Sequence, residues 1–203
     1  MDKEKLDNLF ETAYEYCQVN HRDVLAWANS INEDTFKNLD QAGFLYEYCW
    51  VVYASNFKYE IISEKFPKIK KAFKDFDLDK IVKMKSVDPV LKVFNSERKA
   101  NSFLKGCRLI YDEGFDNFKK RLAKEGIDTL EELGGIGKIV KYHLAKNIGL
   151  ADCAKPDIWM VRVAEYCDGD LKKIVPYLCK KHKLSAHTVD VILWKYCVEQ
   201  GLE

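Results

Sequence analysis

The sequence predicts an all-α protein, and three observations lead to this prediction. Apolar residues recur at helical spacing along nearly the whole chain of 203 residues. No segment shows the two-residue alternation that is typical of a half-buried strand. Proline is scarce, with four residues in the chain, and glycine is concentrated around residues 134–137. Because 47% of the residues are apolar and 13% are aromatic, the chain can also bury a substantial core.

The N-terminal half of the chain predicts a series of helices of different character. Residues 4–19 carry a single apolar stripe, whereas residues 40–56 are almost continuously apolar and aromatic, which indicates a helix buried on most sides. We expect the helix over 57–66 to stop at Pro67, because the residue before a proline disfavours helical geometry. The other helices expected in this half cover residues 22–31, 68–74 and 77–84.

The C-terminal half continues the helical pattern after a break at Asp88-Pro89. A long helix is expected over 96–112, with Ser96 as its cap and Gly114 beyond its end. Residues 128–133 open with a sequence similar to a capping box. The remaining helices are expected over 115–124, 138–148, 158–167, 169–181 and 185–200.

Composition excludes several classes of protein. No run of 18 apolar residues occurs, so no segment is expected to span a membrane. The charged N-terminal segment lacks the apolar core of a signal peptide, so we expect the protein in the cytoplasm or nucleoid. The seven cysteines are odd in number and lie mostly within apolar helical patterns, which favours reduced cysteines over disulfides.

Charge alone does not indicate a partner. The formal net charge is +1, and two lysine-rich stretches, residues 65–74 and 172–183, stand out along the chain. Such clusters are usually solvated helix faces. A nucleic-acid partner therefore has to be argued from motifs.

A glycine-rich turn between two expected helices is the first such motif. The sequence Leu133-Gly-Gly-Ile-Gly-Lys138 holds three glycines in four positions, which allows a sharp turn and leaves bare amides at the start of the next helix. Such amides bind anions, phosphate in particular, and Lys138 and Lys141 would reinforce the site. A turn of this kind can also be purely structural.

A second motif follows downstream, in the sequence Lys155-Pro-Asp-Ile-Trp-Met-Val-Arg-Val163. Together the two motifs resemble the helix-hairpin-helix DNA glycosylase superfamily, which includes endonuclease III, 8-oxoguanine glycosylase and alkylbase glycosylases. The hairpin corresponds to Leu133–Gly137, and the aspartate that follows it in the family corresponds to Asp157. The resemblance extends, more thinly, over about residues 40–165.

The resemblance implies that Asp157 is the catalytic residue. Breaking an N-glycosidic bond builds positive charge at the anomeric carbon, and a fixed carboxylate stabilises that charge and can position or deprotonate a water molecule. Asp157 is also well placed to cap the helix that begins at Ile158, and both roles can coexist. The base must leave the duplex to react. By position, Asn56 matches the family residue that fills the gap, although it can also be read as a polar C-cap.

The sequence departs from the family at three positions. Members that also cut the DNA strand carry a lysine where this chain has Ile139, so we expect a monofunctional glycosylase that leaves an abasic site. Lys138 and Lys141 are the displaced lysines of a bifunctional alternative. Trp159 replaces a frequent histidine, and Gly134 replaces a usual proline, which should loosen the hairpin slightly.

The resemblance also implies an architecture and its cofactors. We expect two helical subdomains with a cleft between them: residues 38–150, ending in the hairpin, and residues 1–37 with 151–203. The cysteine loop of the endonuclease III branch is missing, so no iron–sulfur cluster and no catalytic metal are expected, and a monovalent cation at the hairpin is the one ion left open. The expected partner is double-stranded DNA, bound by a monomer.

The sequence does not identify the base that is excised. Candidates for the base pocket are Trp50, Tyr53 and Trp159, with Tyr46 and Trp194 as weaker choices, although aromatic residues at helical spacing are more often core. An adenine-specific member would have glutamate where this chain has Val52. Alkylated purines, oxidised guanine, uracil-type lesions and a modified base of phage DNA all remain, so the role can be repair or defence. The competing hypothesis is a non-catalytic DNA-binding module.

Overall fold

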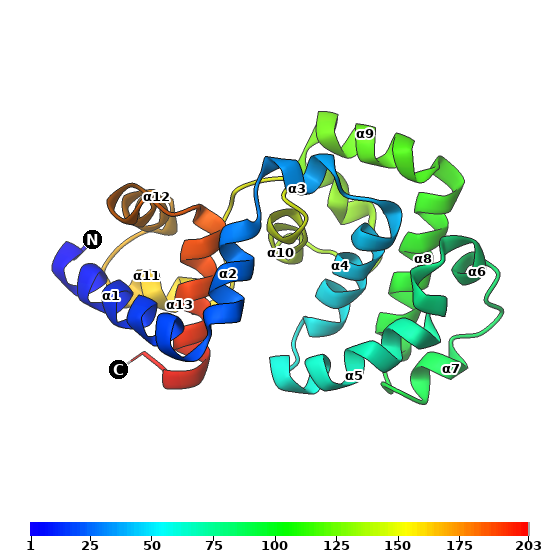
Figure 1. Cartoon of the computed structure of the whole chain (residues 1–203), viewed down its shortest axis with the longest axis horizontal. Helices are drawn as coiled ribbons and strands as arrows, with labels where there is room; N and C mark the ends of the chain where they lie inside the picture. The colour runs from blue at the N-terminus through cyan, green and yellow to red at the C-terminus, as the bar shows by residue number, and fades with distance from the viewer. Residues whose placement is uncertain (203) are drawn as a thin grey trace. The chain divides into compact units, whose positions relative to one another are not determined.

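A computed structural model of the chain describes residues 1–202, and these residues form helices and connecting turns without a strand (Figure 1). The described chain divides into two compact units, one made of residues 1–36 and 151–202 and the other of residues 37–150. Within the described residues, no helix has the length and apolarity needed to cross a membrane.

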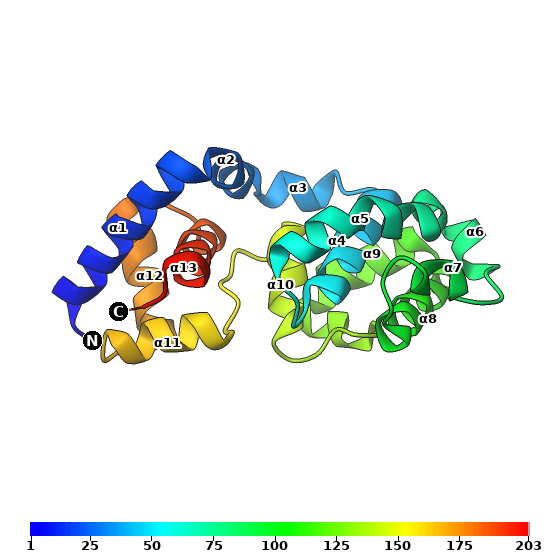
Figure 2. The same ribbon diagram turned by 90° about the horizontal axis from the view of Figure 1, so that it is seen from below.

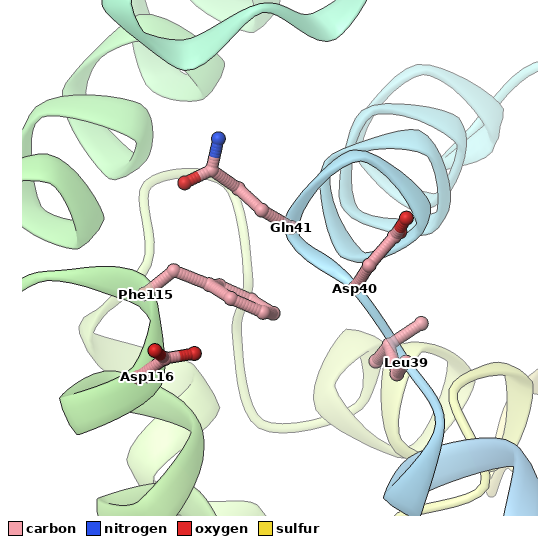
Figure 3. Close-up of a pocket in the computed structure, with 5 residues that line it drawn as sticks. All are labelled: Leu39, Asp40, Gln41, Phe115 and Asp116. Carbon is pink, nitrogen blue, oxygen red and sulfur yellow. The ribbon is translucent and has the colours of Figure 1, made fainter.

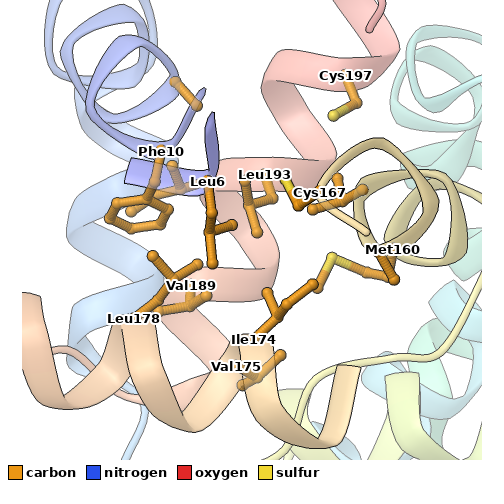
Figure 4. Close-up of a cluster of buried hydrophobic side chains, with 14 of the residues drawn as sticks. Leu6, Phe10, Met160, Cys167, Ile174, Val175, Leu178, Val189, Leu193 and Cys197 are labelled. Carbon is orange, nitrogen blue, oxygen red and sulfur yellow. The ribbon is translucent and has the colours of Figure 1, made fainter. Parts of the chain in front are cut away.

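The unit formed by both ends of the chain is built around its last helix. It contains α1 (Lys3–Asn20), α2 (Arg22–Ser30), α11 (Ile158–Tyr166), α12 (Leu171–His182) and α13 (Ala186–Gln200), and α13 contacts the other four. Figure 4 shows side chains from several of these helices meeting in one apolar cluster. Leu6, Phe10, Ile174 and Leu193 in this cluster are fully buried.

The unit formed by residues 37–150 is built around the aromatic helix α4 (Gln41–Ala54), which the second view of the chain shows among its neighbours (Figure 2). The elements that contact α4 most are α5 (Tyr59–Ala72), α8 (Glu97–Glu113) and α10 (Val140–Asn147). In the core of this unit the Phe103 ring packs edge to face with Phe73 and at a tilted angle with Tyr48. The other elements here are η1 (Lys74–Phe76), α6 (Leu78–Val82), α7 (Asp88–Leu91), α9 (Phe115–Glu125) and the 3₁₀ helix η2 (Ile127–Glu132), while the short α3 (Glu33–Lys37) lies at the boundary in sequence.

Two expectations about prolines are wrong. Pro67 does not end a helix but lies inside α5, and Asp88-Pro89 opens the short helix α7 instead of breaking the chain. Pro67 is solvent-exposed, so the carbonyl that it leaves unpaired can bond to water, while Phe66 and Ile69 on the inner face are buried. At the start of α7, proline costs no hydrogen bond, since the first amides of a helix have no partner within it.

Candidate functional site

The glycine-rich turn forms a tight connection between η2 and α10. Leu133 and Ile136 anchor it, being 1% and 5% exposed, and the amide of Ile136 donates to the carbonyl of Leu133 at 3.1 Å. Gly135 has a φ of 82°, in the left-handed region that favours glycine. The turn therefore needs a glycine at position 135 for its backbone geometry.

The exposed face of the turn consists of main-chain groups and Lys138. Gly135, Gly137 and Lys138 are exposed, and the first helical hydrogen bond of the next helix runs from the amide of Lys141 to the carbonyl of Gly137 at 3.0 Å. Within residues 1–202, no hydrogen bond is formed by the amides of residues 137–139. Bare amides at a helix N-terminus attract anions, so this face can bind a phosphate.

Gly134 is held firmly, in contrast to the expectation that a glycine here would loosen the turn. The Tyr48 hydroxyl donates to its carbonyl at 2.6 Å and lies 3.2 Å from the carbonyl oxygen of Ser102. A Cβ atom on Gly134 would lie 2.2 Å from that Ser102 oxygen. The position therefore accepts only glycine, because α8 passes directly against the turn.

Lys141 does not have the role that the sequence suggested. Its ammonium lies 2.6 Å from the Asp128 carboxylate and 2.5 Å from that of Glu131, and its side chain is 10% exposed. These carboxylates raise the pKa of Lys141 above its usual value. Lys141 thus ties η2 to α10, and its charge is already neutralised, so Lys138 alone of the two lysines is available for phosphate.

Glu47 ties the aromatic helix to the far end of α10, and sequence reasoning missed it. Its carboxylate accepts a hydrogen bond from the Asn147 side chain at 2.9 Å. Burial raises the pKa of Glu47 to about 7, although the Asn147 hydrogen bond acts in the opposite direction. The signal in the sequence was that Glu47 is the one acidic or basic residue in α4.

Asp157 caps helix α11. One carboxylate oxygen, Oδ1, accepts hydrogen bonds from the amides of Trp159 at 3.0 Å and Met160 at 3.3 Å. The other, Oδ2, lies 3.1 Å from the Lys155 ammonium, and the Asp157 side chain remains 15% exposed. The carboxylate is thus fixed in orientation by one oxygen while the other keeps a polar partner, which is compatible with both roles expected for it.

The aromatic residues proposed for a base pocket lie in different settings. Tyr53 is fully buried against Phe73 and Phe94, so it belongs to the core and cannot line an open pocket. Trp50 is partly exposed and packs against other rings. Trp159 is partly exposed, with the Arg162 guanidinium 5.0 Å from its ring. Of the three main candidates, Trp50 and Trp159 therefore remain, and the weaker candidates Tyr46 and Trp194 are also at least partly exposed.

Asn56 lies in the turn after α4. It is exposed and has a φ of 63°, a left-handed conformation that asparagine adopts more readily than most residues. Ile139, at the position of the expected lysine in strand-cutting members, is 43% exposed at the start of α10. Both positions are accessible to a ligand.

The structure also contains a shallow surface depression that none of the predicted site residues line. It has a volume of about 430 Å³ and is formed by residues at the start of α4 and of α9, namely Leu39, Asp40, Gln41, Phe115 and Asp116 (Figure 3). Asp40 already caps α4 by accepting from the amide of Gly43 at 2.7 Å. Within residues 1–202, no group of three histidine, cysteine or acidic side chains is arranged to hold a metal ion.

Comparisons with known proteins give a likeness in structure but not in sequence. No protein-family model matches the chain, and no curated protein matches it. The 8-oxoguanine DNA glycosylase of Thermotoga maritima superposes with a TM-score of 0.66 at 15% identity, over 97% of this chain and 98% of that one. The 8-oxoguanine glycosylase/lyase of Methanocaldococcus jannaschii, in complex with a 15mer DNA containing 8-oxoguanine, gives 0.66 at 18% identity, over 96% and 99%. The chain therefore has the all-helical fold of these 8-oxoguanine DNA glycosylases.

Proposed function

We propose that this protein is a DNA glycosylase that removes a damaged or modified base from double-stranded DNA. The observation that carries the proposal is the fixed, partly exposed carboxylate of Asp157, in a chain that has a glycosylase fold. A hairpin with bare amides adds a means of holding DNA. The neighbours in structure are named as glycosylases, and one of them is in complex with DNA.

In the proposed reaction, the bond between the base nitrogen and C1′ breaks, and the bonding electrons leave with the base, which takes up a proton. The positive charge that develops on the sugar is stabilised by the Asp157 carboxylate. A water molecule bonds to C1′ through its oxygen and gives one proton to this carboxylate, which releases it to solvent, while the proton that the base takes up comes from solvent. The products are a free base and an abasic site. Lys155 and the two capped amides would hold the carboxylate in position during the reaction.

The hairpin would bind a phosphate of the DNA through the bare amides of residues 137–139, together with the Lys138 side chain. We expect Lys138→Ala to weaken binding to all duplex sequences equally and to lower the slope of log K against log salt by about 1, because one cation–phosphate contact is lost. Fluorescence anisotropy over a salt series measures both quantities.

Lys141→Met is the matched control for that measurement, since Lys141 is paired with Asp128 and Glu131. It should lower the midpoint of urea unfolding without changing the salt slope. A base-selective loss in Lys138→Ala, or an equal slope change in both variants, would contradict the assignment of Lys138 to phosphate.

We further propose that the enzyme is monofunctional, because Ile139 offers no amine to attack C1′. The expected result is that sodium borohydride traps no covalent adduct between the wild-type protein and a duplex from which it releases a base. The variant Ile139→Lys is the informative comparison, since an exposed lysine at this place should give a trapped adduct. Trapping by the wild-type protein would instead indicate a lyase that uses another lysine.

The first substrate to test is 8-oxoguanine, because the structural neighbours are named for it. Alkylated purines, uracil-type lesions and modified bases of phage DNA belong in the same panel. The experiment incubates the protein with oxidised, alkylated, deaminated and phage-modified DNA and identifies free bases by liquid chromatography and mass spectrometry. Release of one base supports the glycosylase and indicates repair or defence, whereas release of none supports a non-catalytic DNA-binding module.

A further inference from the structure

The turn after α4 and the first turn of α5 expose several large apolar side chains. Phe57 is 45% exposed, Tyr59 39% and Ile61 41%, all within the exposed stretch 56–61. Exposed apolar residues that occur singly need no explanation, but a cluster of large ones indicates a surface that contacts a partner.

Phe57 is held in place although its ring is exposed. Its amide donates to the carbonyl of Ala54 at 3.1 Å, and the ring packs edge to face on Phe94, with 4.9 Å between centroids. Phe94 itself is only 6% exposed. The left-handed φ of Asn56 directs the chain into this contact. The Phe57 ring is therefore a fixed projection.

The buried side chain of Lys99 also holds the turn that contains Asn56 and Phe57 in place. Its ammonium donates to the carbonyls of Val52 at 2.6 Å and Ser55 at 2.7 Å, which are acceptors at the end of α4, and it lies 5.1 Å from the centroid of the Phe57 ring. Lys99 is 5% exposed, and this burial, with the nearby Arg98, lowers its pKa to about 8. A cation at the C-terminal end of a helix is favourable, and its position beside an aromatic ring adds a second attraction.

The segment that follows Phe57 along the chain carries more positive than negative charge. The stretch 56–74 contains two glutamates, Glu60 and Glu64, and six lysines, Lys58, Lys65, Lys68, Lys70, Lys71 and Lys74. The Lys65 ammonium lies 5.7 Å from the Phe94 ring, beside the ring that supports Phe57. A fixed aromatic ring that precedes a lysine-rich helix, with Lys65 and Lys99 close to it, fits a polyanion with stacked bases better than it fits an apolar protein surface.

We propose that Phe57 enters the base stack of duplex DNA at the place that a nucleotide has left, and that Lys99 is the positioning residue that holds it ready. Apolar side chains serve as such wedges in proteins that unstack DNA. Asn56 then supplies the turn that presents the ring, and not the group that fills the gap. This inference rests on the proposed function, since it assumes that the partner is a duplex from which a base is extruded.

The test compares binding to an intact duplex with binding to the same duplex carrying a tetrahydrofuran abasic analogue, which needs no catalysis. We expect the wild-type protein to prefer the abasic duplex, and Phe57→Ala to reduce that preference about tenfold, the order expected for one stacked ring. Affinity for the intact duplex should change less than twofold. A 2-aminopurine opposite the abasic site should be quenched by the wild-type protein but not by Phe57→Ala.

Tyr111→Ala is the matched control, because Tyr111 is equally exposed, at 45%, and lies in the same helix as Lys99 but roughly 18 Å along it at 1.5 Å per residue. It should leave the preference unchanged. Phe57→Leu keeps an apolar contact on Phe94 and should retain part of the preference, which guards against a general effect on folding.

Variants of Lys99 test its positioning role. Lys99→Met should lower the preference for the abasic duplex without altering the salt slope on intact DNA, because the ammonium is buried. Lys99→Arg should restore part of that preference.

The proposal would be overturned if Phe57→Ala kept the full preference for the abasic duplex. It would also be overturned if Phe57→Ala changed the oligomeric state of the protein without changing that preference, because the segment would then be a protein contact. Failure of the wild-type protein to release any base would instead contradict the proposed function and leave this comparison standing.

Discussion

Replacing Asp157 by asparagine is expected to lower the rate of base excision by about 100- to 1,000-fold, the loss that follows removal of one group that stabilises charge in a transition state. The asparagine side chain keeps an oxygen that can accept from the amides of Trp159 and Met160, so α11 should remain capped. What it loses is the negative charge that the developing sugar cation requires. Single-turnover kinetics on the base identified by the release experiment measures the effect.

The control for this variant is Asp170→Asn, which changes another capping carboxylate of the same unit. Asp170 caps α12 by accepting from the amide of Lys172 at 2.9 Å and carries no catalytic role in the proposal. Both variants should unfold near the wild-type midpoint and bind intact duplex with wild-type affinity, and only Asp157→Asn should lose excision. Wild-type excision by Asp157→Asn would remove the carboxylate from the mechanism.

Gly134→Ala is expected to destabilise the protein by about 1–3 kcal/mol, the usual cost of forcing an atom into a packed site. The new Cβ would lie 2.2 Å from the carbonyl oxygen of Ser102 and 3.0 Å from its Cα, both main-chain atoms that cannot rotate away. The turn must therefore shift, which would also strain the hydrogen bond from Tyr48. Urea unfolding gives the free energy, and anisotropy should show weaker binding to every duplex, because the amides of the hairpin move together.

Gly137→Ala provides the comparison within the same turn. A Cβ at this position meets nothing within 4 Å, so the free energy of unfolding should stay within about 0.5 kcal/mol of the wild-type value. If both variants were as stable as the wild-type protein, α8 would not press on the hairpin as the structure describes. Equal and large losses would show instead that the turn requires glycine at both positions for its backbone conformation.

The sequence by itself determined the helical fold and the two motifs. The spacing of apolar residues repeats locally, so the helices over 4–19, 96–112 and 185–200 were predicted within two residues of α1, α8 and α13. The left-handed backbone at Gly135 and the N-cap formed by Asp157 could likewise be predicted from the sequence. Both features depend on the residue itself and on its immediate neighbours. Pro67 misled the prediction, since its effect depends on whether the carbonyl that it frees faces water.

Only the tertiary structure decided which polar and aromatic side chains are available to a ligand. Lys138 and Lys141 look alike in sequence, yet two carboxylates from η2 occupy Lys141. Tyr53 and Phe57 look alike as aromatic residues, yet one is fully buried and the other is 45% exposed. Contacts such as Tyr48 with Gly134, and Lys99 with the end of α4, join residues 86 and more than 40 positions apart. No local pattern encodes these contacts, because they form only when the packing of whole helices brings the residues together.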